Sequence, residues 1–303
     1  MSYPKADFVS SAWKDDLFRK KVVFCTGGNG TICSAQVRAL VYLGADACIV
    51  GRNEQKTKNI AKELSEVRTN ARVLGIGGVD VRQPRLLQTA IDRCVEELGG
   101  IDLLIVGAAG NFLASIEDLS PNAFKTVIDI DTLGSYNTVK LTLPHLVKSV
   151  QMQEAGNRGV GPSGRVIFVS ATMHYTGYPL QAHVSAAKAA VDAIAVNFAL
   201  EYGPFGVTSN IISPGPIGGT EGMRKLSMIE KIKEKEGRRV PLQRYGSVKD
   251  IADATVYLFS DAANYVNGEV LVVDGGAWRV LATGPDSGIQ YPENVLTRNT
   301  SKI

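Results

Sequence analysis

The sequence lacks the features that mark membrane and secreted proteins. No apolar run in its 303 residues approaches the ~20 residues that a membrane-spanning helix requires. The first residues, MSYPKADFVSSAWKDD, show no basic segment followed by an apolar one, so we do not expect a secretory signal peptide. Excess charge is also small, because 33 Lys and Arg oppose 30 Asp and Glu and leave a net charge of +3. We therefore expect neither a nucleic acid nor a membrane surface as a partner.

Cysteine is scarce as well, and its spacing argues against a zinc site. The four cysteines, at positions 25, 33, 48 and 94, form no C-x-x-C pair. We expect reduced, mostly buried thiols and no metal site. The remaining composition, 45% hydrophobic and 21% charged, is ordinary for a folded protein with a core. No repeat, low-complexity tract or break in composition indicates a second domain.

Short runs rich in Val, Ile and Leu alternate with longer helical patterns from residue 21 onward. Continuous apolar runs indicate strands that are buried on both faces of a sheet. Strands separated by helices of about 10–15 residues indicate right-handed βαβ units in a parallel sheet. We therefore predict a single-domain, doubly wound α/β fold with about seven parallel strands and helices on both faces. The runs are 21–27, 47–51, 72–81, 101–110, 165–171, 206–215 and 269–276.

Three segments flank or interrupt this pattern. Residues 1–20 are polar and mixed, which predicts an N-terminal arm lying over a domain of residues 21–280. The stretch 218–240 is rich in Lys, Arg and Glu and follows a strand end, where α/β proteins place substrate-covering elements. Residues 281–303 are interpreted as a C-terminal tail.

A glycine-rich turn follows the first predicted strand and opens the first predicted helix. In such a turn, backbone N–H groups can approach a pyrophosphate at the positive end of the helix. Glycine also serves any tight turn, so it is the position between strand and helix that makes the signal specific. The residues predicted to bind a dinucleotide here are Thr26, Gly27, Gly28, Asn29, Gly30, Thr31 and Ile32.

The end of the second predicted strand favours NADPH over NADH. Enzymes that select NADH usually place a carboxylate there to bind the ribose 2′-hydroxyl, whereas an Arg suits a 2′-phosphate. This chain has Gly51-Arg52 and no acid; the alternative is that Arg52 is an ordinary surface residue. Asp80-Val81 is predicted to end the third strand, where Asp80 could approach the adenine or could cap a helix.

These features, with GAAGN (107–111), Lys188, SPGPI (213–217) and DGG (274–276), resemble the short-chain dehydrogenase/reductase family over about residues 20–280. The resemblance implies a Rossmann-type fold, a dimer or tetramer, and a nicotinamide at the carboxyl ends of the strands. The further cofactor contacts that it implies are Ala108, Gly110, Lys188, Pro214, Gly215, Pro216, Ile217 and Thr220.

The chain departs from this family where ketone chemistry is performed. Ketone-reducing members carry a Tyr four residues before the active-site Lys, and its hydroxyl protonates the carbonyl oxygen. Here Val184 stands four residues before Lys188, and valine has no proton to give. Ala171 stands at the position of the family's Ser, and Asp131 at the position of its Asn. Either the chain binds nucleotide without catalysis, or it runs a reaction that needs no proton on a ketone oxygen.

The phosphate turn departs from the family as well. Thr31 and Cys33 stand where two glycines are usual, which leaves the detailed path of the turn open but not its location.

One branch of the family, the 2,4-dienoyl-CoA reductases, fits the second interpretation. The chain is especially similar to the peroxisomal members, and its final Ser301-Lys302-Ile303 resembles the Ser-Lys-Leu address read by the peroxisomal import receptor. The resemblance implies NADPH-dependent reduction of 2,4-dienoyl-CoA to 3-enoyl-CoA in the peroxisomal matrix, within β-oxidation of unsaturated fatty acids. The matching segments are 108–112, 119–124, 129–131, 183–190, 214–222, 241–244 and 272–278.

This reaction assigns roles to three residues. Hydride added at the far end of the diene, C5, sends electrons to the thioester oxygen, and a proton is then added at C2. Asp131, expected on the inner face of the fourth helix, is the predicted acid, directly or through a water; the alternative is a structural carboxylate bridging to Lys188. Lys188 is expected to bind the nicotinamide ribose and to add positive charge near the oxyanion. Tyr175 lies in a loop where mitochondrial dienoyl-CoA reductases carry an active-site Tyr, so it is a candidate oxyanion donor or else a packing residue.

Two histidines and a set of substrate contacts complete the predicted site. His183 is interpreted as a packed or capped histidine, and the role of His174 is left open. Because CoA carries several negative charges, Arg and Lys at the cleft mouth favour its capture. Two alternatives to the leading function are a 2-enoyl-CoA reductase and a non-catalytic NADPH-binding scaffold. The predicted acyl-CoA contacts are Arg52, Arg82, Asn111, Phe112, Ser120, Pro121, Asn122, Arg224 and Lys225.

Overall fold

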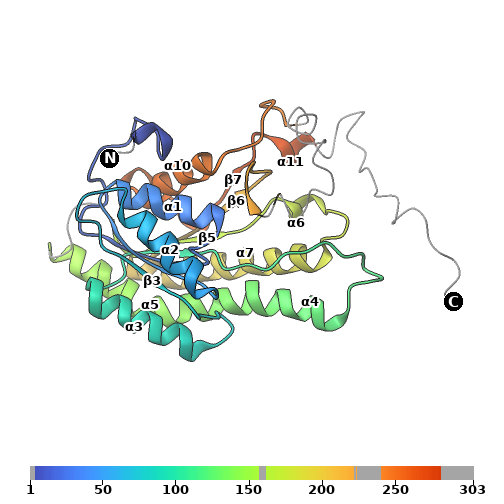
Figure 1. The fold of residues 1–303 in the computed structure, drawn as a ribbon, viewed down its shortest axis with the longest axis horizontal. Coiled ribbons are helices and arrows are strands. Elements are labelled where there is room, and N and C mark those ends of the chain that lie inside the picture. The colour runs from blue at the N-terminus through green and yellow to red at the C-terminus, as the bar shows by residue number, and fades with distance from the viewer. Residues whose placement is uncertain (1–3, 157–161, 222, 224–239, 281–303) are drawn as a thin grey trace, which may run out of the picture.

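A computed structural model describes residues 4–156, 162–221, 223 and 240–280 (Figure 1). The predicted contacts Arg224 and Lys225, most of the covering segment, and the tail with Ser301-Lys302-Ile303 lie outside the described residues.

The described residues form a seven-stranded parallel sheet in the order β3-β2-β1-β4-β5-β6-β7. The chain winds outward from β1 in one direction and from β4 in the other, so the order reverses between these two strands. Ligands of open α/β sheets bind at the carboxyl ends of the strands beside such a reversal. The predicted doubly wound fold is confirmed. The strands are β1 (Val22–Thr26), β2 (Asp46–Val50), β3 (Val73–Ile76), β4 (Leu103–Val106), β5 (Arg165–Val169), β6 (Thr208–Pro214) and β7 (Val270–Val273).

Helices cover both faces of the sheet (Figure 1). Core residues of α1, α2 and α10 pack on one face, and those of α3, α5 and α7 pack on the other. Along β1, Val23 and Cys25 join the first core, whereas Val22 and Phe24 join the second, which explains the continuous apolar run. The helices are α1 (Thr31–Tyr42), α2 (Glu54–Ser65), α3 (Pro84–Leu98), α4 (Pro121–Ile128), α5 (Gly134–Glu154), α6 (Met173–Thr176), α7 (Ala182–Tyr202), α10 (Val248–Phe259) and α11 (Ala277–Val280).

Two expected positions are corrected by the structure. The third strand does not reach Asp80-Val81 but ends at Ile76, because Gly77 and Gly78 follow it and Gly78 has a φ of +71°. Asp131, expected on the face of a regular helix, lies in a π-helical turn, Asp129–Leu133, between α4 and α5. Such turns occur often at functional sites.

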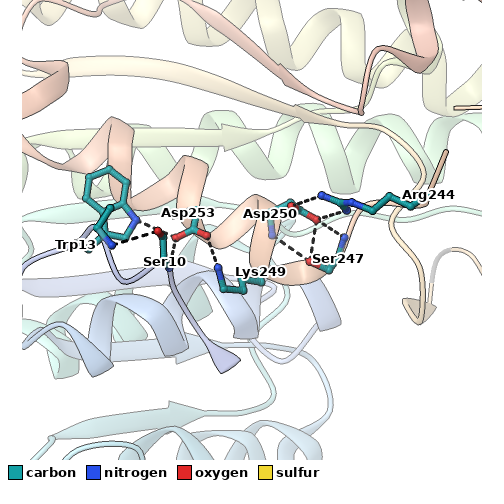
Figure 2. A network of polar contacts seen from close by, with 8 residues as sticks. Ser10, Trp13, Arg244, Ser247, Lys249, Asp250 and Asp253 are labelled. Carbon is teal, nitrogen blue, oxygen red and sulfur yellow. Dashed lines mark hydrogen bonds and ion pairs between the residues drawn. The ribbon is translucent and has the colours of Figure 1, made fainter. Parts of the chain in front are cut away.

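The N-terminal arm contacts α10 through Ser10 and Trp13, and the end of α1 through the Phe18 N–H, which donates to the Leu43 carbonyl. Figure 2 shows the backbone N–H of Ser10 and the indole N–H of Trp13 donating to the same oxygen of Asp253, at 2.7 and 2.9 Å. Lys249 binds the other oxygen of Asp253 at 2.8 Å. Val9 is fully buried in the core beneath. Apolar packing and one carboxylate thus hold the arm.

The start of α10 is held by a second carboxylate. Ser247 and Asp250 form a capping box, and Arg244 binds both oxygens of Asp250 at 2.9 Å (Figure 2). The Arg244 guanidinium holds the pKa of Asp250 well below its usual range. These contacts anchor the chain that returns from the predicted covering segment.

The described part of the chain contains no helix that combines the length and apolar character needed to cross a bilayer. It also contains no cluster of His, Cys, Asp and Glu able to hold a metal ion. The four cysteines are free and buried.

Candidate active site

The phosphate turn requires glycine at its first corner. Gly27 has a φ of +67°, and a Cβ there would lie 2.7 Å from the Gly107 carbonyl oxygen and 2.9 Å from Ala108. Helix α1 begins at Thr31 after Gly30, which offers no side-chain cap to the first N–H groups. An uncapped helix N-terminus behind a glycine turn suits a pyrophosphate. The predicted turn is therefore present at the end of β1.

Cys33, an unusual residue for this turn, fits because Gly107 has no side chain. A Cβ on Gly107 would lie 2.2 Å from the Cys33 sulfur. The Gly107 N–H donates to the buried Thr26 hydroxyl at 3.2 Å, which joins the ends of β1 and β4. Cys33 therefore takes the place of the family's usual glycine because the facing residue, Gly107, leaves room for its side chain. The turn stays at the end of β1.

Asn29 points away from the expected pyrophosphate site. Its side-chain amide donates to the Thr57 hydroxyl of α2 at 2.8 Å and covers Gly51, where a Cβ would lie 2.4 Å from the amide nitrogen. The side chain therefore fixes the turn against β2 and α2, which leaves only the backbone of Asn29 for a ligand.

Charged groups gather where the adenosine half of a dinucleotide would lie. Asp80 binds the Arg82 guanidinium at 2.6 Å, and this contact lowers the pKa of Asp80. Arg52, which is exposed, also lowers that pKa through its charge. The Asn137 side chain holds the carbonyl of Val81 at 3.0 Å. The structure brings Arg52, Asp80 and Arg82 together, with Arg82 engaged by Asp80.

Lys188 is fixed between two oxygen atoms at the carboxyl end of β5. Its ammonium donates to the Val169 carbonyl at 3.0 Å and lies 3.2 Å from Asp131 Oδ2. Asp131 is fully buried, and its Oδ1 accepts the Gly110 N–H at 2.7 Å. The carboxylate thus links the loop after β4 to the ammonium on α7. This is the bridge to Lys188 that the sequence left as an alternative, and the geometry does not by itself assign an acid.

Val184 is packed where ketone-reducing relatives carry their phenol. The side chain is 3% exposed and forms a small apolar cluster with Val127 of α4 and Ala187, against which Met173 packs. The position therefore has neither a proton donor nor a polar partner.

The segment after β6 folds back over the phosphate turn. The Glu221 N–H lies 3.4 Å from the Thr31 hydroxyl, and the buried Thr220 hydroxyl donates to the Ile217 carbonyl at 2.9 Å. Gly215 has no room for a side chain, because its Cβ would lie 2.3 Å from that of Asp274. The segment that carries the predicted cofactor residues Pro214, Gly215, Pro216, Ile217 and Thr220 thus reaches the start of α1 through the contact of Glu221 with Thr31.

The predicted substrate contacts lie at two separate helix starts, Phe112 beside α7 and Ser120, Pro121 and Asn122 at α4. Phe112 packs on His183 with ring centroids 4.2 Å apart. His183 is fully buried, and burial lowers its pKa, so the ring is neutral. The Ser120 hydroxyl accepts the Ala123 N–H and caps α4, so Ser120, Pro121 and Asn122 form a helix start.

Tyr175 belongs to a network that the sequence did not reveal. Its hydroxyl donates to Asp192 Oδ2 at 2.8 Å, and the same oxygen lies 2.8 Å from His174 Nε2. The Tyr175 ring is 38% exposed and packs on Trp278. Burial, followed by the contact with Asp192, raises the pKa of Tyr175. Asp192 stands four residues after Lys188, and this helical spacing is the signal that could have identified it.

Several buried polar atoms at this end of the sheet have no protein hydrogen-bond partner among the described residues. Buried polar groups are normally paired, so such a group indicates a place for ligand or water. The atoms are Asn111 Oδ1, Asp131 Oδ2, Ser170 Oγ, Gln181 Oε1 and Asp192 Oδ1.

Known proteins resemble the whole domain. A family model described as Enoyl-(Acyl carrier protein) reductase matches residues 28–277. The peroxisomal 2,4-dienoyl-CoA reductase SPS19 of Saccharomyces cerevisiae is 49% identical over 96% of this chain and 95% of its own. A solved short chain dehydrogenase of Bacillus anthracis has a TM-score of 0.73 and 31% identity over 87% of this chain and 98% of its own. The chain belongs to the short-chain dehydrogenase/reductase family.

Further members of the short-chain dehydrogenase/reductase family are similar to this chain in sequence and in fold. The peroxisomal 2,4-dienoyl-CoA reductase of Danio rerio is 41% identical over 89% of this chain and 85% of its own. The solved levodione reductase has a TM-score of 0.77 and 26% identity over 86% of this chain and 98% of its own. Reductases of this family use a nicotinamide cofactor, and the turn at Gly27, the uncapped α1 and the fixed Lys188 fit that group.

Proposed function

We propose that this protein is an NADPH-dependent 2,4-dienoyl-CoA reductase that forms 3-enoyl-CoA in the peroxisomal matrix, during β-oxidation of unsaturated fatty acids. The observation that carries the proposal is the packed Val184 beside an intact Lys188, which leaves a hydride-transfer site without the phenol that ketones need. Relatives from yeast, fish, plant and mouse, at 39–49% identity, are named peroxisomal 2,4-dienoyl-CoA reductases that produce (3E)-enoyl-CoA.

NADPH supplies hydride to C5 of the dienoyl group when it is bound. Arg52 is proposed to bind its 2′-phosphate, since no carboxylate follows β2 and Arg52 is exposed beside Asp80. The turn Thr26–Ile32 holds the pyrophosphate, Asp80 and Val81 border the adenine, and Lys188 holds the nicotinamide ribose. The remaining sides of the NADPH site are proposed to be formed by Ala108, Gly110, residues 214–217 and Thr220.

The thioester oxygen gains negative charge when hydride reaches C5. Hydrogen-bond donors aimed at such an oxygen commonly make the greatest single contribution to catalysis. We assign this role to the Tyr175 hydroxyl, which its raised pKa keeps protonated, with the Lys188 ammonium adding positive charge. The single Tyr175 proton is donated to Asp192 in this structure, so it must turn from Asp192 to the thioester oxygen when substrate binds. Asn111 and Phe112 are proposed to line the substrate. Asn111 Oδ1 is buried without a protein partner among the described residues, which suits a polar ligand atom or a water beside it.

The proton added at C2 is assigned to Asp131, directly or through a water. Asp131 Oδ2 is buried and makes no hydrogen bond within the described structure, although it lies 3.2 Å from the Lys188 ammonium. This oxygen can hold a water between the carboxylate and the substrate carbon.

The proposal also covers the contacts to CoA, import into the peroxisome and the oligomeric state. Arg52, Arg82 and the start of α4 at Ser120, Pro121 and Asn122 are proposed to contact the CoA end of the substrate, and Arg224 and Lys225 to bind CoA phosphates. Ser301-Lys302-Ile303 is proposed to engage the peroxisomal import receptor, in line with the peroxisomal names of the relatives. A homo-oligomer, a dimer or tetramer, is proposed from the family resemblance.

The test is incubation of the purified protein with NADPH and 2,4-hexadienoyl-CoA, with 2-hexenoyl-CoA as the comparison. Loss of the conjugated-diene absorbance with no turnover of 2-hexenoyl-CoA is the expected result. Equal turnover of 2-hexenoyl-CoA would select an enoyl-CoA reductase. Tight NADPH binding without turnover of either would select a non-catalytic scaffold.

A further inference from the structure

A polar cluster lies one helical turn beyond Lys188. Asp192 Oδ2 accepts from the Tyr175 hydroxyl and faces His174 Nε2, each at 2.8 Å. The other ring nitrogen, His174 Nδ1, lies 2.6 Å from the Ala171 carbonyl oxygen. Both partners are buried, since the side chains of His174 and Asp192 are only 6% and 13% exposed. Water therefore screens the charges of His174 and Asp192 only weakly.

The two ring contacts of His174 determine how many protons the His174 ring and the Asp192 carboxyl group hold together. A carbonyl oxygen has no proton, so Nδ1 must carry the hydrogen donated to Ala171. The contact between Nε2 and Asp192 also needs a proton, because two lone pairs would otherwise face each other in a buried site. That proton makes either an imidazolium beside a carboxylate or an imidazole beside a carboxyl group. Both forms are electrically neutral, whereas the pair without the proton carries one negative charge.

The elements packed around α6 bring few other charges. On α7, Lys188 is already bound to the Val169 carbonyl and paired with a carboxylate. On α11, Arg279 stacks on Trp278 at 3.9 Å, and Asp274 accepts the Trp278 N–H. Strand β6 contributes the uncharged Ser213. His174 is thus the cation that the geometry offers to Asp192.

We propose that His174 and Asp192 are positioning residues for Tyr175, and that their shared proton keeps the surroundings of the phenol neutral while the thioester oxygen becomes negative. The inference rests on the proposed function, because it takes Tyr175 as the donor to that oxygen. It adds a histidine–carboxylate pair to the site and assigns it a charge state.

A bare carboxylate at Asp192 would oppose catalysis in two ways. It would hold the Tyr175 proton more strongly, since hydrogen bonds to charged acceptors exceed those to neutral ones. It would also repel the developing oxyanion, and such repulsion is large in a site shielded from water. The neutral pair weakens both effects, so the Tyr175 hydroxyl rests on Asp192 without substrate and can turn its proton to the thioester oxygen as charge develops there.

A charge-rescue cycle tests this role. In His174→Gln the amide can still donate to Asp192 but brings no charge, so kcat for 2,4-hexadienoyl-CoA is expected to fall about 10- to 100-fold, with the KM for NADPH nearly unchanged. Asp192→Asn removes the charge that His174 balances, so the double variant His174→Gln/Asp192→Asn is expected to recover at least about half of that loss, on a logarithmic scale. His145→Gln, beside Gly100 and Ile101 at the other end of the sheet, is the matched control.

A second readout needs no turnover. In ¹H–¹⁵N spectra of the imidazole groups, His174 is expected to show a slowly exchanging Nδ1 proton and a downfield proton shared with Asp192, and Asp192→Asn abolishes the downfield signal. A wild-type protein that binds NADPH but turns over no dienoyl-CoA would overturn the proposed function and the role of Tyr175, while the spectra would still decide the pair. Absence of the shared proton, or a double variant no faster than His174→Gln, would overturn the inference.

Discussion

The phosphate turn and the Tyr175 cluster, two regions at the same end of the sheet, are held in different ways. The turn is fixed by local backbone requirements, since Gly27 has a positive φ and no space for a side chain. The Tyr175 hydroxyl is fixed by Asp192, which is 17 residues away in the sequence, and its ring by Trp278. The phosphate turn therefore depends on the shape of the backbone. The Tyr175 cluster depends on charged and aromatic side chains that distant parts of the sequence bring together.

The largest expected effect concerns the reacting half. Asp131→Ala should lower turnover by about 10²–10⁴-fold if Asp131 supplies the proton, and it should also weaken NADPH binding, because Lys188 and the Gly110 N–H lose their carboxylate partner. Asp131→Asn keeps an acceptor for the Gly110 N–H, which lies 2.7 Å from Oδ1, and separates the acid role from the positioning role. Turnover and NADPH titration measure both. Wild-type turnover in either variant would leave Asp131 as a structural bridge to Lys188.

Arg52→Asp addresses the charge on the cofactor side. It should shift the ratio of kcat/KM for NADPH over NADH by about 10- to 100-fold toward NADH, because the new carboxylate repels a 2′-phosphate and suits a 2′-hydroxyl. Arg93→Asp on α3, whose partner is Glu97, is the charge-matched control. An unaltered preference would remove Arg52 from the phosphate site.

Gly27→Ala tests whether the turn depends on backbone shape. The new Cβ would lie 2.7 Å from the Gly107 carbonyl in a left-handed conformation. We expect about 1–3 kcal/mol lower unfolding free energy and about tenfold weaker NADPH binding. Gly156→Ala has a similar φ, +75°, with nothing within 4 Å of the new Cβ, so it isolates the steric part. Equal losses of NADPH binding in the two variants would contradict the role of the close approach.

The smallest effect concerns the carboxylate at the start of α10. Because the pKa of Asp250 is lower in the folded than in the unfolded protein, its contribution is full above the unfolded pKa of about 4 and is lost as pH falls through the folded pKa. The Arg244–Asp250 pair is partly exposed, so Asp250→Asn should lower the unfolding free energy by only about 0.5–1 kcal/mol at pH 7. Urea unfolding at pH 7 and pH 3 should show this difference shrinking in acid. If the difference in unfolding free energy between the wild type and Asp250→Asn grew at pH 3, the ionised Asp250 would not be the stabilising form.

The sequence predicted those parts that depend on order along the chain. Strands β1 to β7 and the turn at Gly27 follow from buried runs and the residues at their ends, although β3 ends at Ile76 and not at Val81 as predicted. The π-helical turn around Asp131 could not be predicted, because no residue pattern distinguishes it from a continuous helix.

The charge environment of Tyr175 was also beyond prediction. It depends on which oxygen of Asp192 two separate side chains reach, and this is decided by packing among α6, α7 and α11.

The central claim is that hydride goes to a conjugated carbon because Val184 leaves no proton for a ketone oxygen. The most direct measurement uses NADPH carrying deuterium on the transferred position, 2,4-hexadienoyl-CoA as substrate, and NMR of the product. We expect deuterium at C5 of 3-hexenoyl-CoA. Deuterium at C3, or on the alcohol carbon of an efficiently reduced ketone, would contradict it.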